Sequence, residues 1–179
     1  YAYGPSSAIK GGDLQGIINA ADYIKELGCN AIWMTPIFNS NGEGHLDSTG
    51  YFTYDYFNVD PKFGTNEKFR ELVETYHEKG MYVILDGVFG HWGANVAPSP
   101  TGKTPTRSNG QNKACDYPAS LEFFKEVATY WIKEYKIDGW RLDQCYQVGS
   151  GDQSPGDNCD TGGYNYWYHI RIAVEQAAA

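Results

Sequence analysis

Apolar residues return every three or four positions in four stretches of the chain, which is the spacing of amphipathic helices. The stretches run from 14 to 27, from 69 to 76, from 124 to 135 and from 164 to 179. Residue types that favour helix caps precede the first three stretches, and glycines end the first two. The expected caps are Asp13, Thr65 and Ser120, and the expected helix stops are Gly28 and Gly80.

Continuous apolar runs lie between these helices and predict buried strands over residues 31–34, 81–86 and 137–143. The second run ends in Asp86 and the third ends in Asp143. Buried strands that alternate with amphipathic helices indicate a parallel sheet covered by helices. The sequence therefore predicts an α/β fold.

Two long segments break this alternation, an aromatic-rich loop over 39–64 and a Pro-, Gly-, Ser- and Asn-rich insertion over 91–119. Both follow the carboxyl ends of strands, where α/β proteins place functional loops. The predicted strands and helices are too few for a closed (β/α)8 barrel of roughly 250 residues. We expect either a small open sheet or part of a barrel, with a strand preceding the first helix.

Composition narrows the class of protein. The chain has 179 residues, of which 41% are hydrophobic, so it can build a core and is not disordered. A net charge of -8 argues against nucleic acid and anionic membranes as partners. No apolar run approaches the ~18 residues of a membrane span. Aromatic residues make up 16%, and such side chains serve either as sugar platforms or as core.

The four cysteines do not form a Cys-x-x-Cys pair, so a zinc site is not expected. Cys29 begins an apolar run and is expected to be a buried free thiol, whereas Cys115 and Cys159 lie in polar loops and could pair. Four cysteines permit about three pairings, and the sequence does not choose among them. The chain starts at Tyr1 and not at Met, which is expected of a processed protein or a piece of a larger one.

Arg141 and Asp143 form the strongest chemical pattern. Residues two apart in a strand point to the same face, so a guanidinium and a carboxylate project together from the end of this strand. A neighbouring cation favours the ionised, nucleophilic form of a carboxyl group. From the spacing alone, a purely structural ion pair explains this pattern as well as a catalytic one does. Two further patterns are weaker. Asp86 is also explained as a strand-end turn residue, and His91 as a surface imidazole. The aromatic run 50–57 is also explained as a strand with two apolar faces.

Four motifs in order resemble the α-amylase family, glycoside hydrolase family 13. They are Asn-Ala-Ile-Trp-Met-Thr-Pro at 30–36, Gly-Tyr-Phe at 50–52 with Asp-Tyr-Phe-Asn-Val-Asp-Pro-Lys-Phe-Gly-Thr at 55–65, Asp-Gly-Val-Phe-Gly-His at 86–91 and Gly-Trp-Arg-Leu-Asp at 139–143. The resemblance implies a partial (β/α)8 TIM barrel, about strands 2–4 with flanking helices. A short inserted domain would follow the third barrel strand. The implied bounds are 1–90 and 120–179 for the barrel and 91–119 for the insertion.

The resemblance also implies roles for individual residues. Asp143 would be the nucleophile that forms a glycosyl-enzyme ester, and Arg141 would hold it ionised. His91 would bind a sugar hydroxyl, Tyr51 would stack under the same sugar, and Asp86 would support Arg141. The remaining implied sugar-binding residues are Phe52, Trp92 and Gln147. The substrate would be an α-glucan or malto-oligosaccharide, and extracellular or periplasmic location is the matching expectation.

The chain departs from the family at several positions. Gly90 stands where the family has a calcium-binding Asn, so no metal ligand is assigned, although calcium stays possible. Tyr146 and Gln147 replace a Lys-His pair. The general acid of the family is a Glu on the fifth strand, and Glu175 lies on a predicted helix and is no candidate. We therefore expect a chain that is inactive alone and that associates with the rest of the barrel or with itself.

Two other classes remain open. A non-catalytic carbohydrate-binding module derived from such a barrel would explain the aromatic content. A self-contained open α/β domain of the flavodoxin type would use Asp86 and Asp143 as a metal-binding pair, but no Gly-rich phosphate loop supports it. Retention of oligosaccharide affinity by the 179 residues would favour the binding module.

Overall fold

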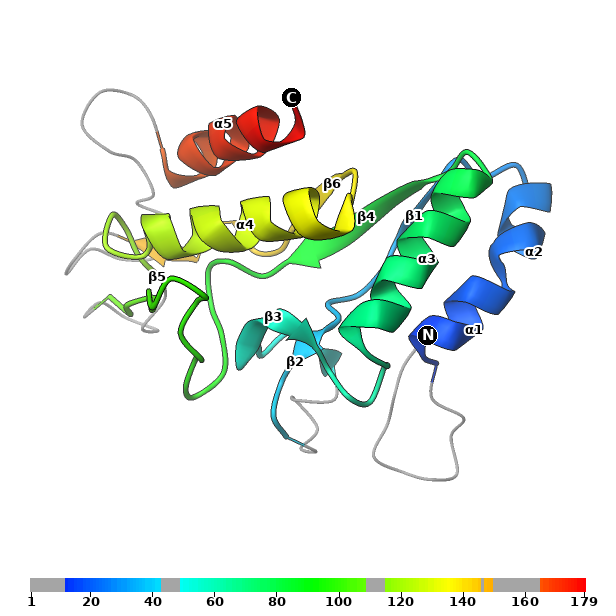
Figure 1. The fold of residues 1–179 in the computed structure, drawn as a ribbon. Helices are drawn as coiled ribbons and strands as arrows, with labels where there is room; N and C mark the ends of the chain where they lie inside the picture. The colour runs from blue at the N-terminus through cyan, green and yellow to red at the C-terminus, as the bar shows by residue number, and fades with distance from the viewer. Residues whose placement is uncertain (1–11, 43–48, 109–114, 146, 150–164) are drawn as a thin grey trace.

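The centre of the molecule is a parallel sheet in a computed structural model that describes residues 12–42, 49–108, 115–145, 147–149 and 165–179 (Figure 1). Its strand order is β1-β4-β6, with β1 at Ala31–Trp33, β4 at Tyr82–Gly87 and β6 at Gly139–Leu142. All neighbouring strands are parallel, and Asp86 on β4 pairs in register with Arg141 on β6. The prediction of an α/β fold with a parallel sheet is confirmed.

The helices are α1 (Leu14–Asn19), α2 (Ala21–Glu26), α3 (Asn66–Glu78), α4 (Leu121–Tyr135) and α5 (Tyr166–Ala178). α1 packs against α3, and α5 packs against α4 (Figure 1). The single helix predicted over 14–27 is wrong, because Ala20 has a ψ of -2° and its turn divides the segment into α1 and α2. Among the described helices, none has the length and apolar content to cross a membrane.

Two of the predicted helix caps are confirmed and one is wrong. The side chain of Asp13 accepts a hydrogen bond from the Gly16 amide at 2.8 Å, and that of Thr65 accepts one from the Lys68 amide at 3.1 Å. Ser120 makes no such bond to α4. Its hydroxyl instead accepts from the Thr106 amide at 2.8 Å and donates to the Thr106 carbonyl at 2.9 Å. Ser120 therefore ties the insertion to the start of α4. Gly28 and Gly80, with φ of 84° and 68°, end α2 and α3 as predicted.

The segment predicted as a long loop contains a strand. β3 (Asp55–Val59) pairs antiparallel with β2 (Phe38–Asn39). Part of the aromatic run 50–57 therefore forms a strand. Its neighbouring residues Tyr56 and Phe57 are both buried, so both faces of the strand are apolar there. The insertion over 91–119 also carries a short strand, β5 (Cys115–Asp116), which pairs in parallel with β7 (Val148–Gly149).

Burial at β1 and at two cysteines differs from the predictions. Trp33 and Ala31 are exposed, because among the described strands β1 pairs only with β4 and forms an edge of the sheet. Cys29, which precedes β1, is also exposed, so its predicted burial is wrong. Cys115 is a buried free thiol, and Cys159 lies outside the described residues.

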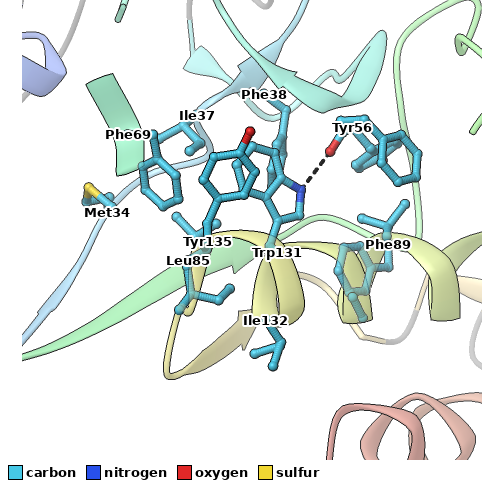
Figure 2. Close-up of a cluster of buried hydrophobic side chains, with 14 of the residues drawn as sticks. Met34, Ile37, Phe38, Tyr56, Phe69, Leu85, Phe89, Trp131, Ile132 and Tyr135 are labelled. Atoms are coloured by element: carbon cyan, nitrogen blue, oxygen red, sulfur yellow. Dashed lines mark hydrogen bonds between the residues drawn. The ribbon is translucent and has the colours of Figure 1, made fainter. Parts of the chain in front are cut away.

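Trp131 on α4 occupies the centre of the core (Figure 2). Its indole nitrogen donates a hydrogen bond to the Tyr56 carbonyl at 2.8 Å, and its ring lies 5.3 Å from that of Phe38. Tyr56 in turn donates from its hydroxyl to the Val88 carbonyl at 2.6 Å, and the same oxygen lies 3.2 Å from the His91 carbonyl. The core therefore fixes the backbone that follows β4 and carries His91.

Candidate active site at the strand ends

Arg141 joins two acidic side chains at the carboxyl ends of β4 and β6. Its Nη1 lies 3.0 Å and 3.1 Å from the two carboxylate oxygens of Asp86, and 2.8 Å from Oδ1 of Asp143. Asp86 lies on the neighbouring strand, directly opposite Arg141, whereas Asp143 follows Arg141 by two residues in the same segment. The structure thus brings together Arg141 and Asp143, which the strand pattern placed on one face, and Asp86, which only the family resemblance placed beside them.

Asp86 is fully buried and accepts hydrogen bonds from three different side chains. Besides Arg141, the indole nitrogen of Trp33 donates to Oδ2 at 3.0 Å and the Tyr51 hydroxyl donates to the same oxygen at 3.4 Å. Burial raises the pKa of Asp86, and the Arg141 guanidinium acts in the opposite direction. These donors compensate the carboxylate for its lost hydration, as a buried charge requires.

The guanidinium of Arg141 also lies over the ring of Trp33, 5.1 Å from its centroid. Partial burial acts to lower the pKa of Arg141, but the carboxylates of Asp86 and Asp143 raise it above its usual value. The bridging group therefore stays cationic. The sequence analysis did not assign Trp33 to the site. The one available signal was its indole N–H donor, on a strand that pairs with the strand ending in Asp86.

Asp143 offers one carboxylate oxygen for chemistry. Its Oδ1 is held by Arg141, and its backbone amide donates to the Gly87 carbonyl at 3.0 Å. No hydrogen bond to Oδ2 is recorded from the described residues. The side chain is mostly buried but keeps 10% of its surface exposed. A carboxylate that is oriented through one oxygen and unengaged at the other can attack an electrophilic carbon.

Tyr51, Phe52 and His91 lie around this cluster and are half-buried. Burial raises the pKa of the Tyr51 hydroxyl, which Asp86 reinforces. Burial lowers the pKa of His91, and the Asp143 carboxylate opposes that effect. The rings of Phe52 and His91 lie 5.6 Å apart, and Nδ1 of His91 is buried without a hydrogen-bond partner in the described part of the chain. Both His91 and Tyr51 therefore stand beside the acids with hydrogen-bonding capacity.

The structure does not bring Trp92 and Gln147 into this cluster. Trp92 is 6% exposed and packs against Phe124, with the Arg107 guanidinium 4.9 Å from its ring centroid. Gln147 donates from its side-chain amide to Gln144, and its backbone lies against Gly90. Neither residue has a hydrogen bond, ion pair or ring contact with Asp86, Arg141 or Asp143, and their sugar-binding role stays a prediction.

Gly90 does not fit the role of a calcium ligand. A Cβ atom at this position would lie 3.0 Å from the Gln147 carbonyl oxygen and 3.1 Å from its Cβ, so the room for a side chain is taken. The glycine also offers no side-chain oxygen to a hard cation. The described ranges contain no group of three or more His, Cys, Asp or Glu side chains arranged to hold a metal ion.

A parallel α/β sheet with an acid–arginine cluster at the carboxyl ends of its strands is typical of α/β enzymes, whose active sites lie at that end of the sheet. Comparison with known proteins narrows the class. The model of the α-amylase catalytic domain matches residues 3–120. A cyclomaltodextrinase of Thermoanaerobacter pseudethanolicus is 37% identical over 93% of this chain and 31% of its own length. An intracellular maltogenic amylase of Bacillus subtilis is 35% identical over 77% of this chain and 27% of its own length. This chain belongs to the α-amylase family.

Solved structures agree with the sequence relatives. The crystal structure of AmyP in complex with maltose has a TM-score of 0.80 and 53% identity, and the match covers 98% of this chain and 33% of that one. A structure of an AmyP variant in complex with maltotriose matches equally well. This chain spans about a third of the length of these relatives.

Proposed function

We propose that this chain supplies part of the active site of a retaining α-glycoside hydrolase, with Asp143 as the nucleophile. The observation that carries the proposal is the Arg141 bridge, which orients Asp143 through one oxygen and leaves the other unengaged. In the first step Oδ2 of Asp143 attacks the anomeric carbon of an α-glucoside, and the bond to the leaving oxygen breaks. A water molecule then hydrolyses the resulting glycosyl ester.

The remaining residues of the cluster take supporting roles in this proposal. Arg141 orients Asp143 through Oδ1, and Asp86 holds Arg141 in place. His91 binds a hydroxyl of the sugar at the cleavage site, while Tyr51 and Phe52 lie along its apolar face. Support comes from their half-buried positions around the acids. A pyranose has both an apolar face and a rim of hydroxyls, which such a set of side chains matches.

The general acid of the reaction lies outside the 179 residues in this proposal. A retaining enzyme needs a second carboxyl group about 5–5.5 Å from the nucleophile, free to donate a proton. Asp86 is not suited to that task, because Arg141, Trp33 and Tyr51 already occupy its two oxygens. We therefore infer that the 179-residue chain alone does not turn over its substrate.

The chain forms part of a (β/α)8 barrel in this proposal, with residues 1–90 and 120–179 in the barrel and 91–119 as a short inserted domain. Support comes from the parallel order β1-β4-β6 and from the exposed edge at β1, where Trp33 is 57% exposed. Further strands would cover that edge. The substrate class, malto-oligosaccharides or starch-like glucans, is supported by the AmyP complexes with maltose and maltotriose.

The experiment is an Asp143→Asn substitution in the protein that contains this chain at its native length. We expect maltotriose turnover to fall by several orders of magnitude, because an amide oxygen is a poor nucleophile, with maltotriose binding retained in calorimetry. Asp22→Asn, at an exposed residue whose ion pair with Lys79 lies on the surface, is the matched control and should retain wild-type turnover. Near-wild-type turnover of Asp143→Asn would remove Asp143 from this role. Binding without turnover in the wild-type protein would favour a carbohydrate-binding module.

A further inference from the structure

The backbone that leads from β4 to His91 is held by buried residues. The Tyr56 hydroxyl lies 2.6 Å and 3.2 Å from the carbonyl oxygens of Val88 and His91. The Gly90 carbonyl accepts a hydrogen bond from the Cys115 amide at 2.9 Å. Tyr56 and Cys115 are both fully buried, so the core fixes this backbone as far as His91. The carbonyls that follow His91 have a different partner.

Arg107, in the inserted segment, holds the next three carbonyls. Its Nη2 donates to the carbonyls of Trp92, at 3.1 Å, and Gly93, and its Nη1 donates to the Ala94 carbonyl at 3.5 Å. The guanidinium also lies over the Trp92 ring, 4.9 Å from its centroid. Within the described part of the chain, these three carbonyls accept no other hydrogen bond. A planar group with five donors can hold several carbonyls at once, so one side chain orders three successive residues.

The segment that Arg107 holds borders two residues of the candidate active site. It follows His91 directly, and the Gly93 amide donates to the Thr53 carbonyl at 3.0 Å. A Cβ atom at Gly93 would lie 3.2 Å from the Phe52 carbonyl, and the Phe52 ring lies 5.6 Å from the His91 ring. Nδ1 of His91 has no hydrogen-bond partner among the described residues. The position of the imidazole therefore depends largely on the backbone that carries it and on Phe52.

We propose that Arg107 is a positioning residue for the reaction, because it fixes the backbone of 92–94 and thereby holds the His91 imidazole where it meets the sugar. The inference rests on the proposed function, in which His91 binds a sugar hydroxyl. Arg107 has no hydrogen bond or ion pair with Asp86, Arg141 or Asp143, so it acts through the backbone and not on the reacting atoms. A misplacement of about 1 Å in such a site can cost about 100-fold in rate.

The test is a double-mutant cycle in the protein at its native length, with maltotriose as substrate. Arg107→Met keeps an unbranched side chain beside Trp92 but removes the donors to the three carbonyls. We expect kcat/KM to fall about tenfold when His91 is present. In a His91→Ala background the same substitution should cost about twofold or less, because residues that act through one another are not additive. A residue that only stabilised the fold would give the same loss in both backgrounds.

Arg70→Met is the matched control. Arg70 likewise donates from Nη1 to a backbone carbonyl, that of Glu134 at 2.6 Å, and lies over an aromatic ring, that of Tyr135 at 4.6 Å. These contacts lie at the end of α4 that precedes β6, whereas the acids lie at the carboxyl ends of the strands. Arg70→Met should therefore keep the wild-type kcat/KM. Hydrogen exchange of the peptide that spans 91–94 gives a second readout, and only Arg107→Met should accelerate it.

Wild-type kcat/KM in a folded Arg107→Met variant overturns the inference, and so does an equal loss with and without His91. If Arg107→Met does not fold, Arg107→Lys replaces it, because an ammonium keeps the charge but not the planar fork. A smaller loss is then expected, and wild-type kcat/KM again overturns the inference. A wild type that binds maltotriose but never cleaves it refutes the hydrolase. In that case weaker maltotriose binding by Arg107→Met in calorimetry supports the positioning role, and unchanged binding overturns it. A wild type that neither binds nor cleaves maltotriose overturns both.

Discussion

Replacing Arg141 with Met tests whether the acidic cluster depends on one cation. The substitution keeps an unbranched apolar side chain but removes the guanidinium, which bridges Asp86 and Asp143 and lies over the Trp33 ring. Both carboxylates stay buried, with side chains 0% and 10% exposed. The variant therefore holds two neighbouring carboxylates without their neutralising partner.

The expected loss of stability follows from that burial. Removing one partner of a buried ion pair costs about 3–5 kcal/mol. The Arg141 side chain is 39% exposed, so solvent screens part of the interaction. Asp86 also keeps its hydrogen bonds from Trp33 and Tyr51. We expect the free energy of unfolding to fall by about 2 kcal/mol near neutral pH.

The loss should depend on pH in a defined direction. Burial raises the pKa of Asp86 above the unfolded value near 3.8, and Arg141 opposes that rise. A carboxyl with a raised folded pKa stabilises the fold below its unfolded pKa and loses that contribution as pH rises through the folded pKa. Removing Arg141 raises the pKa further and enlarges this loss. The difference between variant and wild type should therefore be largest near pH ~7 and shrink toward pH ~4.

Urea unfolding followed by tryptophan fluorescence measures the difference, with midpoint and slope recorded at each pH. Arg171→Met is the matched control, since its ion pair with Glu175 lies on an exposed helix surface and its loss should leave stability unchanged. If Arg141→Met were as stable as Arg171→Met near neutral pH, or if its deficit grew on acidification, the carboxylates would not depend on Arg141 as described.

Two further predictions concern packing and thiol chemistry. Gly90→Asn should destabilise the fold by about 1–3 kcal/mol, because its Cβ would meet the Gln147 carbonyl at 3.0 Å; thermal unfolding at the wild-type temperature would contradict this. Exposed Cys29 should react with a thiol reagent in the folded protein, whereas Cys115 should react only after unfolding, because burial raises its pKa to about 12. Peptide mapping of the labelled protein measures this difference, and labelling of Cys115 in the folded protein would contradict its burial.

One half of the acid–arginine cluster was predictable from local pattern, because alternation along a strand places Arg141 and Asp143 on one face. The position of Asp86 beside Arg141 depends on the pairing of β4 with β6, so it was expected only from the resemblance to the α-amylase family. The ends of α2 and α3 were also predictable from local pattern, since Gly28 and Gly80 adopt positive φ there.

The features that were missed depend on contacts between distant segments. Trp33 joins the site only because β1 lies beside β4, and its exposure reflects a sheet edge that the apolar run does not reveal. Ser120 has the residue type of a helix cap, but its hydroxyl donates a hydrogen bond to the carbonyl of Thr106, fourteen residues earlier in the chain. The pairing of β2 with β3 likewise joins two segments across a loop. Such long-range choices are set by the folded structure and not by local pattern.

Trapping the glycosyl ester tests the role of Asp143 most directly. The protein at its native length would be incubated with a fluorinated α-glucosyl fluoride, which slows hydrolysis of a covalent intermediate, then digested and analysed by tandem mass spectrometry. The account predicts one added fluoroglucosyl group on the side chain of Asp143. A label on any other carboxylate, or steady hydrolysis of the reagent with inversion of the anomeric centre and no covalent adduct, would contradict it.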